Sequence, residues 1–127
     1  MYQRVIISGR LGGDPVMKYL QDGTPVTSLN VATSERWNKN GEKMERTTWW
    51  RVSVFGKQAE PCNQYLSKGS AVLVEGTITV DSETGGPRVW TGTDGNPRAS
   101  LELRASGVTF LSSKGEASES QADAMPF

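Results

Sequence analysis

Apolar and polar residues alternate along five segments of the chain, which is the pattern of half-buried β-strands. The first segment alternates with only Ile6 out of pattern. The strongest strand signal is residues 47–55, where every residue except Arg51 and Ser53 is β-branched or aromatic. The five predicted strands cover residues 4–11, 26–33, 47–55, 71–80 and 100–111.

The last predicted strand changes face within its length. Leu101 and Leu103 lie on one face, whereas Val108 and Phe110 lie on the other, with Ser106 and a glycine between the two pairs. A change of face at a glycine predicts a β-bulge or a bend at this point.

One short helix is predicted between the third and fourth strands. Pro61 suits the first helical position, and Gly69 suits the position after the helix end. Ala59, Cys62 and Leu66 then line one helix face. Five strands with this helix position indicate a mainly all-β protein with the OB-fold, a five-stranded Greek-key barrel. A sandwich of short strands is the alternative.

Composition favours a binding protein over an enzyme. The 127 residues suit one domain, and no apolar stretch is long enough to cross a membrane, so we expect a soluble protein. The N-terminus lacks a signal-peptide core, and the single Cys62 suits a reducing cytoplasm. There is no histidine, no cysteine cluster and no glycine-rich phosphate loop, so we expect no catalysis, cofactor or metal. Asp81 and Glu83 are candidates to hold a cation, although two acids in a glycine loop more often form a solvated turn.

The formal net charge of zero hides two parts of opposite sign. Residues 1–111 form the predicted folded domain, with 13 basic and 11 acidic residues, or +2. Residues 112–127 are small and polar, with Lys114 against three acids, or −2, and we expect them to be disordered. A neutral total therefore does not exclude a nucleic-acid binder.

The tryptophans at 49 and 50 are adjacent in a strand, so they point to opposite faces. Trp50 shares its face with the valines two and four residues further on, which indicates a core or subunit-contact face. Trp49 shares its face with Arg51, Ser53 and Phe55. This mixture makes a poor core and a good platform for stacked bases beside phosphate.

Trp37 lies in a predicted polar loop over residues 37–43, and Trp90 lies in a polar stretch. Any one of these aromatic residues has a structural alternative, such as covering an apolar patch or stabilising a sheet by cross-strand contacts. Their combination with interspersed cations favours nucleic-acid binding. These cations are Arg36, Lys39, Lys43, Arg46, Arg51, Lys57 and Arg88.

Several segments resemble the bacterial single-stranded-DNA-binding protein family. They are IISGRLGGDP at 6–15, LNVATSE at 29–35 leading to Trp37, TWWRVSVFGK at 48–57, YLSKGS at 65–70 and VEG at 74–76. The last five residues, DAMPF, are similar to the family's C-terminal tip. The resemblance implies an OB-fold homotetramer that wraps single-stranded DNA and has neither catalytic activity nor a cofactor.

The resemblance also assigns roles to individual residues. The stacking aromatics are Trp37, Trp49, Phe55 and Trp90, and the basic DNA contacts are Lys18, Arg51, Lys57 and Lys68. The first strand is expected to pair subunits edge to edge. The tip residues Asp123, Met125, Pro126 and Phe127, including the ring of the last residue, are expected to dock replication, recombination and repair proteins. The expected location is the cytoplasm, in association with the nucleoid.

Three features depart from the family pattern. Trp50 stands where the family often has histidine, residues 81–87 form an added turn, and the tail is short with only three acids. Other hypotheses are an OB-fold scaffold of the primosome type, a strand-annealing or RNA-binding protein, and, less favoured, an enzyme.

Overall fold

The computed structural model describes residues 1–112, which form a strand-rich domain with one short helix. The predicted tip residues Asp123, Met125, Pro126 and Phe127 lie outside the described residues. The helical elements are η1 (Gly56–Gln58) and α1 (Ala59–Tyr65). The strands are β1 (Val5–Leu11), β2 (Val16–Tyr19), β3 (Pro25–Lys39), β4 (Glu42–Phe55), β5 (Ala71–Ile78), β6 (Val89–Thr91), β7 (Pro97–Ala99) and β8 (Leu101–Phe110).

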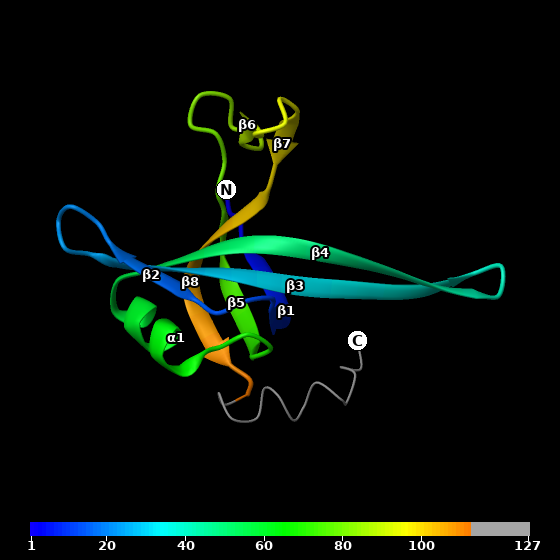
Figure 1. Ribbon diagram of the computed structural model, residues 1–127, viewed down its shortest axis with the longest axis horizontal. Helices are drawn as coiled ribbons and strands as arrows, with labels where there is room; N and C mark the ends of the chain where they lie inside the picture. The colour runs from blue at the N-terminus through cyan, green and yellow to red at the C-terminus, as the bar shows by residue number, and fades with distance from the viewer. Residues whose placement is uncertain (113–127) are drawn as a thin grey trace.

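Five strands close into a barrel in the order β1-β5-β8-β4-β3 (Figure 1). The closing contact pairs Arg10 and Leu11 of β1 with β3. The β4–β8 pairing is parallel, whereas the other barrel pairings are antiparallel. β2 adds to the outer edge of β3, and α1 lies between β4 and β5 in the chain. The predicted OB-fold is therefore confirmed, and the sandwich alternative is wrong.

The core is formed by one side of each barrel strand together with one face of α1. The predicted helix face of Ala59, Cys62 and Leu66 is fully buried. The hydroxyl of Thr27 on β3 donates a hydrogen bond of 2.6 Å to the carbonyl of Ala59, which fixes α1 against the barrel. The buried cluster comprises Ile7, Leu11, Leu29, Val31, Val52, Val54, Cys62, Leu66, Val72, Val74 and Leu103.

The helix boundaries differ from the prediction. The chain turns at Gly56, passes through η1 and enters α1 two residues before Pro61. α1 ends at Tyr65, because Leu66 has extended backbone angles. Gly69, with φ +92°, forms the turn into β5 instead of capping the helix.

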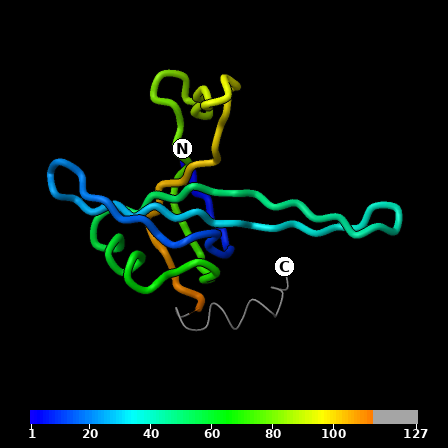
Figure 2. The backbone as a smooth tube through the Cα atoms, viewed as in Figure 1, coloured from blue at the N-terminus to red at the C-terminus, as the bar shows by residue number. Residues whose placement is uncertain are grey.

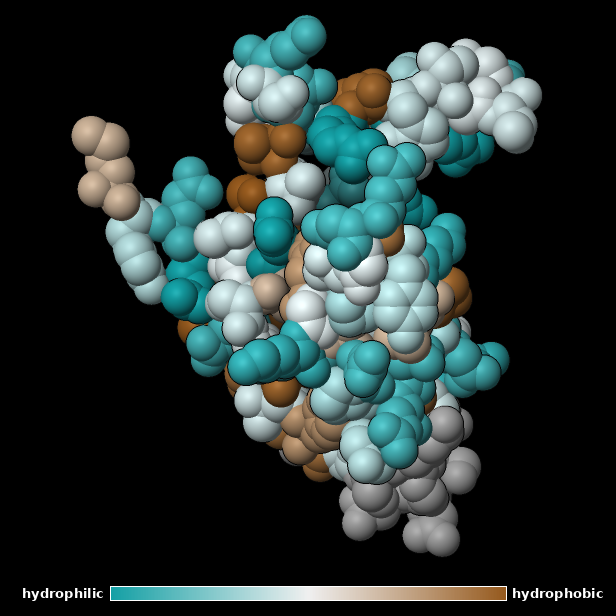
Figure 3. All heavy atoms as spheres, turned by 90° about the vertical axis from the view of Figure 1, so that its left-hand side faces the viewer, coloured by the Kyte–Doolittle hydropathy of each residue, from teal (hydrophilic) through white to brown (hydrophobic). Residues whose placement is uncertain are grey.

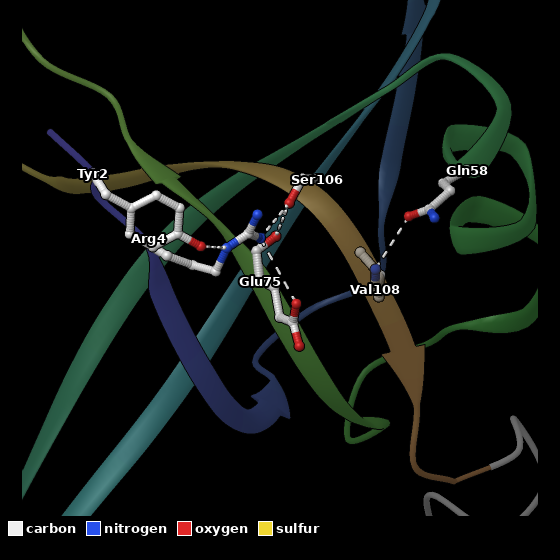
Figure 4. Close-up of polar contacts among 6 residues, drawn as sticks. All are labelled: Tyr2, Arg4, Gln58, Glu75, Ser106 and Val108. Carbon is white, nitrogen blue, oxygen red and sulfur yellow. Dashed lines mark hydrogen bonds and ion pairs between the residues drawn. The ribbon is translucent and has the colours of Figure 1, made fainter.

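The predicted irregularity in the last strand is a β-bulge at Ser106. The β5–β8 register shifts there, which leaves this residue without a paired partner on β5. The Ser106 hydroxyl accepts a 2.9 Å hydrogen bond from Arg4 and donates to the Glu75 carbonyl (Figure 4). The side-chain oxygen of Gln58 accepts a hydrogen bond from the amide of Val108 just beyond the bulge. Local polar groups thus compensate for the interrupted ladder.

Besides the β2–β3 hairpin, the far part of β3–β4 and the β6–β7 hairpin project from the barrel (Figures 1 and 2). In the far part of β3 and β4, the predicted polar loop at 37–43 is instead two paired strands. They are joined by Asn40 and Gly41, with φ of 52° and 82°, which is the conformation of a tight type I′ turn. Because both faces of this ribbon are exposed, its residues do not alternate, and the sequence pattern resembled a loop. The β6–β7 hairpin pairs, within the described part of the chain, only with itself.

The surface is largely polar. Hydrophilic residues cover most of the face shown in Figure 3, and hydrophobic residues gather there in small groups. Within residues 1–112, no helix has the length and apolar character needed to cross a membrane.

Candidate nucleic-acid interface

The outward side of β4 carries the predicted mixture of aromatic and cationic residues. Val52 and Val54 are buried, whereas the alternate residues point away from the core. Trp49 is 55% exposed, Arg51 is exposed, and Phe55 is half-buried. We call the surface formed by Trp49, Arg51, Ser53 and Phe55 the aromatic face.

Neighbouring strands add cations to the aromatic face. Val26 on β3 is in register with Phe55 and also with Lys18 on β2, so these three side chains share one side of the sheet. The strand next to β4 on its other edge is β8, and Arg104 of β8 is in register with Ser53. The guanidinium carbon of Arg104 lies 4.3 Å from the centre of the Phe55 ring. This is a cation–π contact. Arg104 was not among the sequence candidates, because its position depends on the parallel β4–β8 pairing.

Trp49 packs its ring against the loop that follows β1. A Cβ atom on Gly12 would lie 2.3 Å from Cζ3 of Trp49, so only glycine leaves room for the ring in this position. The amide of Gly12 donates to the carbonyl of Asn30, which ties the loop to β3. A groove of about 700 Å³ runs beside the ring, and its lining includes Gly12, Asn30, Trp49, Arg51, Ser100 and Leu101.

Trp37 does not join the aromatic face. It pairs with Met44 near the end of the β3–β4 hairpin. It lies an even number of residues after the core-facing Val31 on the same strand, so the two side chains leave β3 on the same side. Its side chain therefore leaves the ribbon on the side opposite to Trp49. Trp37 is 38% exposed, and the guanidinium carbon of Arg46 lies 5.0 Å from its ring centre.

Trp90 lies on β6, outside the barrel, where it is 39% exposed and in register with Arg98. Arg98 donates a 2.7 Å hydrogen bond to Asp94, whose carboxylate also accepts from the amide of Asn96. These two sets of hydrogen bonds, with the Asn96 contribution the larger, hold the pKa of Asp94 below its ordinary value. The hairpin that carries Trp90 is thus braced within itself.

The turn at 81–87 is organised by Asp81. Its carboxylate accepts hydrogen bonds from the amides of Glu83 and Thr84, at 2.8 and 3.1 Å. These bonds lower the pKa of Asp81. The carboxylate is therefore used to close the turn, in agreement with the solvated-turn interpretation.

The remaining sequence candidates lie at the margins. Lys57 is exposed in η1, two residues after Phe55. Lys68 is exposed in the segment before β5, where its backbone amide donates to the Asp14 carboxylate. Trp50 is half-buried, and its ring nitrogen donates to the Thr33 hydroxyl at 3.1 Å. The structure thus brings Lys18, Arg51, Trp49 and Phe55 onto one surface, but not Trp37 or Trp90.

Comparison with known proteins identifies the family. The model of the Single-strand binding protein family matches residues 2–111. The chain belongs to this family. It is 39% identical over 114 residues to the Single-stranded DNA-binding protein of Neisseria meningitidis serogroup A, with 89% of this chain and 62% of that protein covered. It is 40% identical over 108 residues to the Single-stranded DNA-binding protein 1 of Xylella fastidiosa, with 84% and 74% covered.

The fold also has a solved counterpart. A Plasmodium falciparum structure described as an SSB complex with ssDNA superposes with a TM-score of 0.70 at 26% identity. The match covers 88% of this chain and 96% of that one. The family resemblance and the barrel expected from the sequence are both confirmed by these comparisons.

Proposed function

We propose that this chain binds single-stranded DNA without sequence preference through the aromatic face. The observation that carries the proposal is an exposed Trp49 beside Arg51, on the outward side of a strand whose other side is core. Aromatic rings beside cations on one exposed surface offer stacking for bases together with contacts to phosphates. The relatives, named as single-stranded-DNA-binding proteins, support the same ligand.

Stacking and phosphate contacts supply the affinity. Bases stack on Trp49 and Phe55, at about 1–3 kcal/mol per base, while Lys18, Arg51 and Arg104 face the phosphates. Because the Arg104 guanidinium covers the Phe55 ring in this structure, a base reaching that ring either displaces the guanidinium or stacks on its outer side. Salt weakens such binding with a log–log slope of about −0.7 per phosphate contact.

A bound strand that touches every aromatic candidate has to change surfaces. Trp37 lies on the other side of the β3–β4 ribbon, and Trp90 lies on a separate hairpin. We therefore propose that the strand wraps around the domain instead of crossing one face. Contacts at several linked platforms then raise the overall affinity by multivalency.

We propose that the domain assembles as a homotetramer. Within residues 1–112, only Arg10 and Leu11 of β1 are paired on the β3 side, so the remainder of that edge has no strand partner there. An open edge favours pairing with another strand, and the equivalent strand of a second copy is a suitable partner. The tetramer would multiply the DNA platforms, as multivalent binding requires.

The family resemblance extends the proposal to the wider role of the protein. We propose a non-catalytic protein without a cofactor that protects single-stranded DNA in replication, recombination and repair, in the cytoplasm and on nucleoid DNA. The tip residues Asp123, Met125, Pro126 and Phe127 would recruit partner proteins that offer an apolar pocket with a basic rim.

Tryptophan fluorescence during titration tests the proposed ligand. Oligo(dT) should quench the emission strongly, because bases stack on exposed indoles, whereas duplex DNA should have little effect. Oligo(rU) in a third titration separates a DNA binder from an RNA binder. An equal response to oligo(dT) and duplex, no response, or preferred binding of oligo(rU) would overturn the proposal.

A further inference from the structure

The segment between β5 and β8, residues 79–100, leaves the barrel and returns to it, and we call it the insert. Among the described residues, its two strands, β6 and β7, pair only with each other. Figures 1 and 2 show the insert standing away from the barrel. Its orientation therefore depends on contacts at its base and not on a shared sheet.

The polar links between the insert and the barrel converge on Glu102, the second residue of β8. Its backbone carbonyl accepts a 2.8 Å hydrogen bond from the amide of Thr79, where the insert begins. Its carboxylate accepts from Nη1 of Arg88 at 3.0 and 3.2 Å, just before β6. The Glu102 side chain is only 11% exposed, whereas that of Arg88 is 53% exposed. Removing Arg88 would leave this shielded carboxylate without its charged partner, which costs free energy.

Glu102 also borders the aromatic face. It is in register with Arg51 across the β4–β8 pairing. Ser100, the last residue of the insert, and Leu101, the first residue of β8, line the same groove as Trp49 and Arg51. The orientation of the insert thus sets both the wall of this groove and the position of Trp90.

We propose that Glu102 is a positioning residue that, through Arg88, fixes the orientation of the insert relative to the aromatic face, so that Trp90 and the groove wall meet the bound strand. The proposal rests on the proposed function for its consequence in binding, but the pairing acts in the free protein as well. The internal Asp94–Arg98 pair keeps the hairpin intact, so loss of the Glu102 contact moves the hairpin as a unit.

Charge alone predicts opposite effects of substituting Glu102 and Arg88, whereas positioning predicts the same effect for both. Replacing Glu102 by glutamine removes a negative charge from a phosphate-binding surface, which by itself favours DNA. Replacing Arg88 by glutamine removes a positive charge, which by itself disfavours DNA. A positioning role predicts that both substitutions weaken binding, because both remove the same ion pair.

Hydrogen–deuterium exchange of the full chain tests the contact without DNA. In Glu102→Gln and Arg88→Gln, the amides of residues 88–99 should exchange about threefold to tenfold faster, with barrel amides unchanged. The double variant should show no further increase. Glu60→Gln, an exposed carboxylate on α1, is the charge-matched control and should leave the insert unchanged. Unaltered exchange in the insert of both single variants would overturn the proposal.

Oligo(dT) affinity tests the consequence. Each single variant should bind about threefold to fivefold more weakly, and the double variant no worse than either. Tighter binding by Glu102→Gln together with weaker binding by Arg88→Gln would show a charge effect and overturn the positioning role. Absence of binding by the unsubstituted chain would refute the proposed function instead, and the exchange experiment would still decide the contact.

Discussion

Replacing Trp49 by alanine is the sharpest test of the aromatic face. The side chain is 55% exposed, so a little under half of its surface is buried, mainly beside Gly12. An indole offers about 200 Å² for burial, so about 100 Å² returns to water, and the loss of stability is about 2 kcal/mol at most. A domain of this size has about 6 kcal/mol or more, so the variant should stay folded.

The expected effect on binding can be measured because the variant stays folded. Loss of one stacked base costs about 1–3 kcal/mol, which raises the dissociation constant about fivefold to 150-fold. The assay is fluorescence anisotropy of labelled oligo(dT), with thermal unfolding of the same samples to confirm that the variant is folded. The salt dependence should keep its slope, because no phosphate contact is removed.

Tyr65→Ala is the matched control. Tyr65 lies at the end of α1, away from the outer side of β4, and is 53% exposed, so its truncation exposes a similar area. We expect its affinity for oligo(dT) to be unchanged. If Trp49→Ala bound as tightly as the unsubstituted chain while remaining folded, or if Tyr65→Ala lost as much affinity, the assignment of the aromatic face would be refuted.

Three further predictions concern other parts of the chain. Gly76→Ala should lower the free energy of unfolding in urea by about 3 kcal/mol, because its Cβ would lie 2.0 Å from the backbone oxygen of Arg104; Gly107→Ala, which has open space, is the control, and equal stability of the two variants would contradict this reasoning. Burial raises the pKa of the Cys62 thiol to about 11, so iodoacetamide at pH 8 should modify it only after unfolding, and rapid labelling of the folded chain would be contrary to expectation. Deleting residues 125–127 should leave oligo(dT) affinity unchanged or higher, and loss of DNA binding would show that the tip is not a separate partner-docking element.

Strand alternation and the position of the helix were sufficient to predict the barrel and which residues of β4 point outward. Val52 and Val54 are buried and Trp49 and Arg51 are exposed, as the period of two requires. The change of face near Ser106 likewise predicted the bulge. These features depend on residues close together in the chain, so the local sequence pattern is enough to predict them.

The features that the sequence did not predict depend on solvent exposure or on distant pairing. The β3–β4 ribbon has water on both sides, so no alternation marks it, although Asn40 followed by glycine is a known signal for a tight hairpin turn. The contacts of Arg104 with Phe55 and of Glu102 with Arg88 arise when β8 joins the sheet. Arg104 lies more than 45 residues after Phe55 at the end of β4. Local pattern carries no information on such contacts.

Photocrosslinking most directly tests the claim that single-stranded DNA binds on the outward side of β4. An oligo(dT) containing 5-bromodeoxyuridine is irradiated with the full chain, and the crosslinked residues are mapped by mass spectrometry. We predict crosslinks at the exposed ring of Trp49 and the half-buried ring of Phe55, both on the aromatic face. Efficient crosslinking confined to residues elsewhere, such as Tyr65 on α1, would contradict it.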